Sequence, residues 1–189
     1  MVEKRTQGRL MLIMVGLVFL GPVLLAFWLY YGSDWRPDEQ TIHGHLLSPA
    51  IELPDNPLRT DSNARLRNLW SLIVIAPADC GDACVQALYE TRQVRQALGR
   101  DSDRVQRIWI VEGGEPDLHF ALAEHPDLVI VDASASVGTD ILRRIDARSE
   151  VDVFVVDPTG NLMMQFPTDV GMRGMHSDMK RLLKFSGTG

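Results

Sequence analysis

Residues 69–84 read LWSLIVIAPADCGDAC, and this stretch decides the fold. Its first part is an apolar, β-branched run that predicts a buried strand. The run leads into Cys80 and Cys84, the only two cysteines in the chain, and a helical pattern follows them. This spacing puts the thiols one helical turn apart, and the positive end of a helix dipole favours a thiolate. The pattern is typical of a redox-active or metal-binding dithiol, and equally of a structural disulfide or of two small buried residues.

An uncharged stretch near the N-terminus, residues 10–31, predicts a transmembrane helix. As a helix it would extend about 33 Å, which is enough to cross the hydrocarbon core. Lys4, Arg5 and Arg9 precede it, and positive charge before a span keeps the N-terminus inside. A cleaved signal peptide would need a small-x-small cleavage site, and the residues after Tyr31 offer none. We therefore expect residues 1–9 to be cytoplasmic and residues 10–31 to be a permanent single-pass anchor.

The part of the chain beyond this anchor is acidic. The formal net charge is −6, although three of the four charged residues among the first nine are basic. The sequence has no basic stripe with interleaved aromatic residues, which argues against a nucleic-acid partner. An exported domain also meets an oxidising environment, where two thiols one turn apart pair readily.

A polar segment and then a regular alternation of elements follow the anchor. Residues 32–67 are rich in Pro, Asp and Asn, which predicts an extended linker with a short edge strand near residues 51–53. Apolar patterns predict strands at residues 69–75, 105–111, 128–131, 151–156 and 162–166. Helical patterns occur at residues 84–98, 118–124, 138–146 and 174–185. The turn signal Asp157-Pro158-Thr159-Gly160 makes the last two strands a hairpin.

This order of elements predicts an α/β fold for residues 68–187. Alternating strands and helices imply a mostly parallel central sheet with helices on both faces, and the hairpin adds an antiparallel edge. A dithiol directly after the first core strand of such a series is the thioredoxin layout. The sequence therefore predicts a thioredoxin-like domain preceded by one transmembrane helix and a linker.

Two motifs resemble the SCO/SenC family. They are Cys80-Gly81-Asp82-Ala83-Cys84 between an apolar strand and a helix, and Phe154-Val155-Val156-Asp157-Pro158-Thr159-Gly160 near the C-terminus. The helix around residues 87–95 is similar to that of a divergent SCO-like branch. The resemblance implies a membrane-anchored, thioredoxin-like protein that serves copper-site assembly in cytochrome c oxidase.

The chain departs from this family at two places. Copper-binding members carry a histidine shortly before the last core strand, which completes a Cys-Cys-His site. The corresponding position here lies near Arg148 or Ser149, and neither side chain can bind copper. Val85 stands where a proline usually follows the second cysteine. The resemblance therefore implies a branch without the metal-binding histidine, in which Cys80 and Cys84 would hold Cu(I) between two thiolates.

Other histidines are weaker candidates for a metal site. His43 and His45 lie in the linker and are expected to be solvated. One face of the last helix carries Met172, Met175, His176 and Met179. Thioether and imidazole ligands suit Cu(I), which makes His176 a minor metal candidate. The favoured interpretation is that this stripe packs the helix on the sheet.

These observations lead to two hypotheses about function. In the first, the chain is anchored in a bacterial inner membrane, a mitochondrial one being less favoured, and its domain lies in the periplasm. There Cys80 and Cys84 assist cytochrome c oxidase assembly by thiol–disulfide exchange or by Cu(I) delivery, with an oxidase subunit or another copper chaperone as partner. Such a protein is an assembly factor, and at most a thiol–disulfide oxidoreductase. In the second hypothesis the domain is a non-catalytic binding or scaffold module with a structural disulfide.

Overall fold

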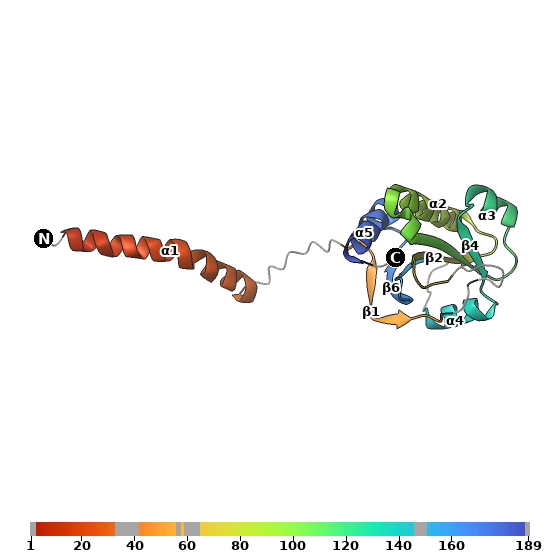
Figure 1. The fold of residues 1–189 in the computed structure, drawn as a ribbon, viewed down its shortest axis with the longest axis horizontal. Helices are drawn as coiled ribbons and strands as arrows, with labels where there is room; N and C mark the ends of the chain where they lie inside the picture. Colours follow the sequence, from red (N-terminus) through yellow and green to blue (C-terminus); the bar gives the residue numbers. More distant parts are fainter. Residues whose placement is uncertain (1–2, 33–41, 56–57, 59–64, 146–150, 188–189) are drawn as a thin grey trace. The chain divides into compact units, whose positions relative to one another are not determined.

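The computed structural model describes residues 3–32, 42–55, 58, 65–145 and 151–187 (Figure 1). Contacts between residues divide the chain into two units, Met1–Gln40 and Thr41–Gly189. Within the described residues, the first unit consists of one helix and the second of a sheet covered by helices. We describe each unit by itself.

The helix of the first unit is α1 (Glu3–Gly32), with Pro22 inside it. It covers the whole uncharged stretch that the sequence marks out, and large apolar side chains such as Leu17, Phe19 and Leu24 are exposed along it. Among the residues that the structure describes, no helix combines the length and the apolar character needed to cross a membrane.

A six-stranded sheet forms the centre of the second unit, in the order β1-β6-β5-β2-β3-β4. Its strands are β1 (His45–Glu52), β2 (Trp70–Pro77), β3 (Val105–Glu112), β4 (Leu128–Asp132), β5 (Asp152–Val156) and β6 (Asn161–Phe166). The helices are α2 (Asp82–Ala97), the short 3-10 helix η1 (Gly99–Arg104), α3 (Leu118–Glu124), α4 (Ser136–Arg144) and α5 (Gly171–Phe185). Every strand and helix predicted beyond residue 68 is therefore present, with ends shifted by a few residues.

The sheet is mixed, and the prediction of a mostly parallel sheet was wrong. β2 pairs in parallel with β3, and β3 with β4. The pairs β2–β5, β5–β6 and β6–β1 are all antiparallel. The alternation of helices and strands suggested a parallel crossover throughout, but the connection through α4 brings β5 beside β2 in the opposite direction. Residue spacing does not encode that direction.

Helices cover both faces of this sheet (Figure 1). α2, α3 and α5 lie on one face, and their core residues include Leu88, Ala121 and Met179. α4 lies on the other face, where Ile141 packs with Ile73 of β2. Because both faces of β2 are covered, seven of its eight residues are buried, which explains its unbroken apolar sequence.

The folded unit begins earlier on the chain than the predicted boundary at residue 68. β1 lies inside the segment expected to be a linker, and it pairs with β6 along the edge of the sheet, Ile51 opposite Leu162. Directly before β1, a Cβ atom on Gly44 would lie 2.6 Å from the Met164 sulfur, so any other residue would force the Met164 and Phe166 side chains to shift. The short edge strand predicted near residues 51–53 is thus present, but it begins earlier than expected, at His45, because its side chains are mostly exposed and show no regular alternation.

Candidate functional site

Cys80 and Cys84 form a disulfide at the carboxyl end of β2. Cys80 lies in the loop that follows Pro77, and Cys84 lies in the first turn of α2. Their sulfur atoms are 2.04 Å apart and their Cα atoms 5.0 Å apart. The backbone N–H of Cys80 donates to the Pro77 carbonyl at 3.2 Å, which closes a turn after the strand. The structure thus brings together the two cysteines that the sequence singled out.

The two cysteines differ in exposure. Cys84 is 1% exposed and belongs to the core between α2 and the sheet. Cys80 is only partly buried where it packs against this core. Its φ of 40° lies in the left-handed region, which a residue other than glycine seldom adopts. Cys80 is therefore the more accessible of the two cysteines.

Opposing charges act near the disulfide. Cys84 is the third residue of α2, and the backbone N–H groups of a helix N-terminus favour a nearby thiolate. Gly81 caps α2 without a side-chain hydrogen bond. Asp79 and Asp82 are exposed carboxylates on either side of Cys80, and their negative charge disfavours a thiolate. The reduced pair should therefore be moderately reactive.

A cavity of about 220 Å³ opens beside Cys80, and we call it the Cys80 cavity. It is lined by Ala78, Asp79, Cys80, Val85, Trp109 and Asp117. Trp109 is 1% exposed, and it contributes an apolar surface. Asp79 and Asp117 add carboxylates from two different loops. The more accessible of the two cysteines thus lines a hollow in which part of another molecule could lie.

A second cavity, of about 180 Å³, lies next to the residue that precedes Cys84. Ala83 and Ala87 of α2, Phe166 of β6 and Met175 of α5 are among the residues that line it. Its lining is mostly apolar, so it is suited to an apolar side chain of a partner segment.

Among the residues that the structure describes, no third metal ligand joins the two cysteines. Within the described part of the chain, no group of three or more His, Cys, Asp or Glu residues could hold a metal ion. The predicted position of the missing histidine, Arg148 or Ser149, lies outside the described residues. His176 on α5 belongs to no such group, and its neighbours Met175 and Met179 are buried in the core. Met175 and Met179 of the stripe therefore pack in the core, whereas Met172 is 40% exposed, and the metal role of His176 stays a prediction.

His43 is held in place, which the sequence did not predict. Its ring Nδ1 lies 3.0 Å from Oδ1 of Asp178, a carboxylate on α5 that is 2% exposed. The other carboxylate oxygen accepts the backbone N–H groups of His43, at 2.7 Å, and Gly44, at 2.9 Å. His43 is exposed, as expected, although its ring also contacts Asp178, and His45 is exposed on β1. Asp178 fastens the start of β1 to α5.

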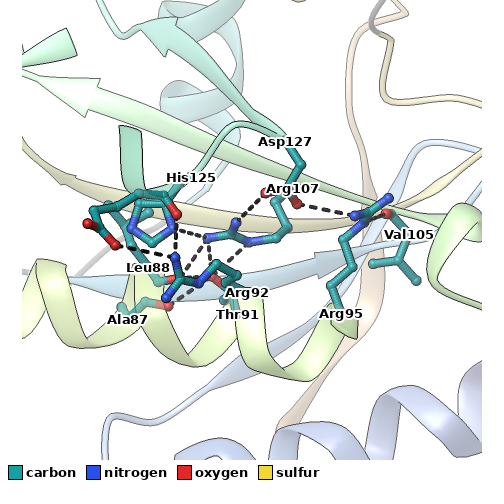
Figure 2. A network of polar contacts seen from close by, with 10 residues as sticks. Ala87, Leu88, Thr91, Arg92, Arg95, Val105, Arg107, His125 and Asp127 are labelled. Carbon is teal, nitrogen blue, oxygen red and sulfur yellow. Dashed lines mark hydrogen bonds and ion pairs between the residues drawn. The ribbon is translucent and has the colours of Figure 1, made fainter. Parts of the chain in front are cut away.

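A buried polar cluster around Arg107 fixes α2 to β3 and to the loop before β4. Figure 2 shows the Arg107 guanidinium between residues of α2 and the side chains of His125 and Asp127. Arg107 is fully buried, and its Nη2 donates to the Leu88 carbonyl at 2.6 Å and to Thr91 Oγ1 at 3.2 Å. Its Nη1 donates to Asp127 Oδ1 at 3.1 Å. A single arginine amid the apolar residues of a predicted strand was the available sequence signal for this cluster.

Burial and repulsion between positively charged side chains lower pKa values in this cluster. Burial lowers the pKa of Arg107 to about 10, although Asp127 acts in the opposite direction. Burial, followed by the positive charges of Arg107 and Arg92, lowers the pKa of His125 to about 4. Arg95 shares Asp127 with Arg107, at 3.3 Å, so one carboxylate serves two guanidinium groups. His125 is therefore neutral at neutral pH, which limits the positive charge beneath α2.

The low pKa of His125 predicts that the fold loses stability as the pH falls from about 6.5 to about 4. In this window the unfolded chain binds a proton at His125 that the folded chain does not, so the free energy of unfolding decreases by roughly 2–3 kcal/mol. The measurement is urea unfolding at a series of pH values. In the variant His125→Gln the free energy of unfolding should change much less between pH 6.5 and 4. His119 is exposed, so the variant His119→Gln is a matched control that should retain the pH dependence of the wild type. Equal pH dependence in both variants would refute the assignment.

Comparison with known proteins places this geometry in a family. A family model described as "Transmembrane-like, thioredoxin-like, C-terminal domain" matches residues 70–186. No curated protein matches the chain.

Solved structures show the same fold at low sequence identity. Apo Sco1 from Thermus thermophilus is 18% identical with a TM-score of 0.56, over 78% of this chain and 98% of that one. Copper-bound ScoI from Arabidopsis thaliana is 14% identical with a TM-score of 0.52, over 76% and 99%. A putative thioredoxin from Neisseria meningitidis is 15% identical with a TM-score of 0.50, over 74% and 91%. These likenesses confirm the predicted thioredoxin-like α/β fold. The family model spans most of the chain, which therefore belongs to the transmembrane-like, thioredoxin-like, C-terminal domain family.

Proposed function

We propose that this protein is a membrane-anchored assembly factor that acts on cytochrome c oxidase by thiol–disulfide exchange at Cys80 and Cys84. The observation that carries the proposal is the unequal exposure of the two cysteines, with Cys84 1% exposed and Cys80 accessible beside a cavity. Exchange chemistry needs one sulfur that a partner can attack and a second that leaves or resolves within the same protein. This pair supplies both.

The exchange reaction balances with a dithiol partner as the only co-reactant. A partner thiolate attacks the Cys80 sulfur, the Cys80–Cys84 bond breaks, and Cys84 leaves as a thiolate that takes up a proton. The second partner thiol, after losing its proton, attacks the partner sulfur of the mixed disulfide and releases Cys80. The partner loses two electrons and the pair gains them. In reverse, the reduced pair reduces a partner disulfide, with Cys80 attacking and Cys84 resolving, which would prepare a partner dithiol for copper.

The proposed partner is an oxidase subunit or another copper chaperone, and the mostly apolar cavity next to Ala83 is suited to a side chain of such a partner. The proposed location is a bacterial inner membrane, with the domain in the periplasm. The uncharged residues 10–31 and the basic residues before them support this location.

A second form of the proposal is Cu(I) delivery by the reduced pair. The donor set fits only a two-thiolate Cu(I) complex, because the described residues contain no group of three His, Cys, Asp or Glu that could hold a metal ion. Thiolates alone suit Cu(I) rather than Cu(II). Copper would be a cargo in this form, and exchange chemistry remains the primary proposal.

The test is the midpoint potential of the Cys80–Cys84 couple, combined with Cu(I) titration. The full-length chain, purified in detergent, is equilibrated with redox buffers, and free thiols are counted by alkylation. We expect a midpoint potential above about −300 mV, as for working dithiols. The reduced chain is then titrated with Cu(I) against a chelator of known affinity, with the variant C80S/C84S as the control. A potential well below that value together with no Cu(I) binding would favour the scaffold module with a structural disulfide.

The role in oxidase assembly has its own readout in cells. Deleting the gene for this protein should lower cytochrome c oxidase activity. Expression of the wild-type protein should restore that activity, whereas expression of C80S/C84S should not. If the double variant restores full activity, the cysteines are structural and the binding-module alternative holds.

A further inference from the structure

Carboxylates lie both in the lining of the Cys80 cavity and on the chain segments next to it. Asp79 lies on the loop after β2, and Asp117 lies on the loop between β3 and α3. These loops are neighbours, because the Ala78 N–H donates to the Glu112 carbonyl at 3.0 Å. Glu112, the last residue of β3, and Glu115 on the second loop are also exposed carboxylates.

The two chain segments that carry these carboxylates are poor in basic residues. Residues 77–90 contain no Lys, Arg or His, and residues 111–124 contain only His119. The loop from Gly81 into α2 adds one more carboxylate, that of Asp82. Among the described residues, both loops that line the cavity therefore contribute carboxylates, those of Asp79 and Asp117.

We propose that Asp79 and Asp117 determine the specificity of exchange at Cys80 by selecting partners whose reactive thiol is flanked by positive charge. This inference rests on the proposed function, since it concerns the same reaction. A partner sulfur must approach Cys80 through a negative potential in a partly desolvated hollow, where charges separated by a few ångströms interact more strongly than in bulk water. A cationic group beside the attacking thiolate lowers the barrier, and an anionic group raises it.

The same argument identifies molecules that react poorly. Glutathione carries a net negative charge at neutral pH, so the cavity should slow its attack on the disulfide. The charge would then protect the pair from general small-thiol reductants and leave it open to a basic protein segment.

Asparagine can replace both Asp79 and Asp117 without disturbing the fold. Asp117 accepts the His119 N–H at 3.0 Å, at the start of α3, and asparagine is an equally good residue at such a helix start. Asp79 is exposed. The variant D79N/D117N should therefore fold normally while it removes two negative charges from the cavity. Asp103 is exposed on η1, before the amino end of β3, so D103N is a control that changes charge away from the cavity.

The experiment measures the reduction of the disulfide in the full-length chain by three small thiols: cysteamine, which is cationic, 2-mercaptoethanol, which is neutral, and 3-mercaptopropionate, which is anionic. Each rate is divided by the rate of the same thiol with bis(3-hydroxypropyl) disulfide, a neutral reference that differs from all three thiols, which removes differences in thiolate fraction and nucleophilicity. We expect cysteamine to exceed 3-mercaptopropionate about tenfold at low ionic strength, and the ratio to shrink in 0.5 M salt because exposed charges are screened.

The variants decide the outcome. D79N/D117N should reduce the cysteamine preference to about twofold or less, while D103N retains it. Equal normalised rates for the three thiols, or an unchanged preference in D79N/D117N, would overturn the charge selection and leave exchange at Cys80 standing. If none of the three thiols reduces the disulfide, the proposed function fails and this inference fails with it.

Discussion

Replacing Arg107 with alanine is expected to lower the free energy of unfolding by about 3–5 kcal/mol, because it removes one partner of a buried ionic cluster. The guanidinium satisfies the Leu88 carbonyl, the Thr91 hydroxyl and the Asp127 carboxylate at once. Alanine would remove the guanidinium donor from all three acceptors, although Asp127 retains Arg95 and the Leu88 carbonyl retains the Thr91 hydroxyl, and it would also leave a cavity. Urea unfolding monitored by tryptophan fluorescence gives the free energy directly.

A matched variant separates the cost of unpaired groups from the cost of lost volume. Arg107→Met fills most of the space without the charge, and buried ion pairs can often be replaced by apolar residues of similar volume. Asp127 retains Arg95 as a partner, at 3.3 Å. We therefore expect the methionine variant to recover at least half of the stability that the alanine variant loses. A loss below about 1 kcal/mol in the alanine variant would show that the cluster is not a major support of the fold.

Separating the two cysteines is expected to give single-cysteine variants that differ in thiol reactivity by at least about 100-fold, because only thiolates that reagents can reach react readily. In Cys84→Ser the remaining thiol is that of Cys80, which lines a cavity. In Cys80→Ser the remaining thiol is that of Cys84, which is 1% exposed. The measurement is the rate of reaction of each variant with a neutral aromatic disulfide.

The same pair of variants reports on the second step of exchange. Cys84→Ser lacks the resolving thiol, so its mixed disulfide with a partner should persist and can be isolated. Urea unfolding of both variants shows whether the fold survives without the disulfide, and the double variant C80S/C84S gives the background rate. Equal reactivity of the two single variants, both still folded, would contradict the assignment of Cys80 as the attacked sulfur.

The sequence revealed the fold where apolar patterns were strong. β2 is buried along seven of its eight residues, so its apolar sequence marked a central strand without ambiguity. The turn at Asp157 was equally clear, and its carboxylate does accept the Thr159 and Asn161 N–H groups. The direction of β5 was not predictable, because a helical connection of this length can return the chain either way.

Long-range polar contacts were the part of the structure that the sequence hid. Asp178 and His43 are separated by 135 residues, and no local pattern connects them. Arg107 looked like a stray charge on a strand until Thr91 and Asp127 were brought beside it by the fold. The candidate cysteines were easier to find, since their chemistry depends on a spacing of four residues that the sequence states outright.

The hydrogen bonds from His43 and Gly44 to Asp178 of α5 matter for the design of truncated variants. A truncated protein that starts at residue 68 would lack β1 and the backbone groups that Asp178 holds, at 2.7 and 2.9 Å. β6 would then present a bare row of hydrogen-bonding groups, which invites edge-to-edge association between molecules, and a buried carboxylate would lose its donors. Truncated variants that begin before Ile42 retain β1 and the hydrogen bonds to Asp178, and we expect these variants to give monodisperse protein.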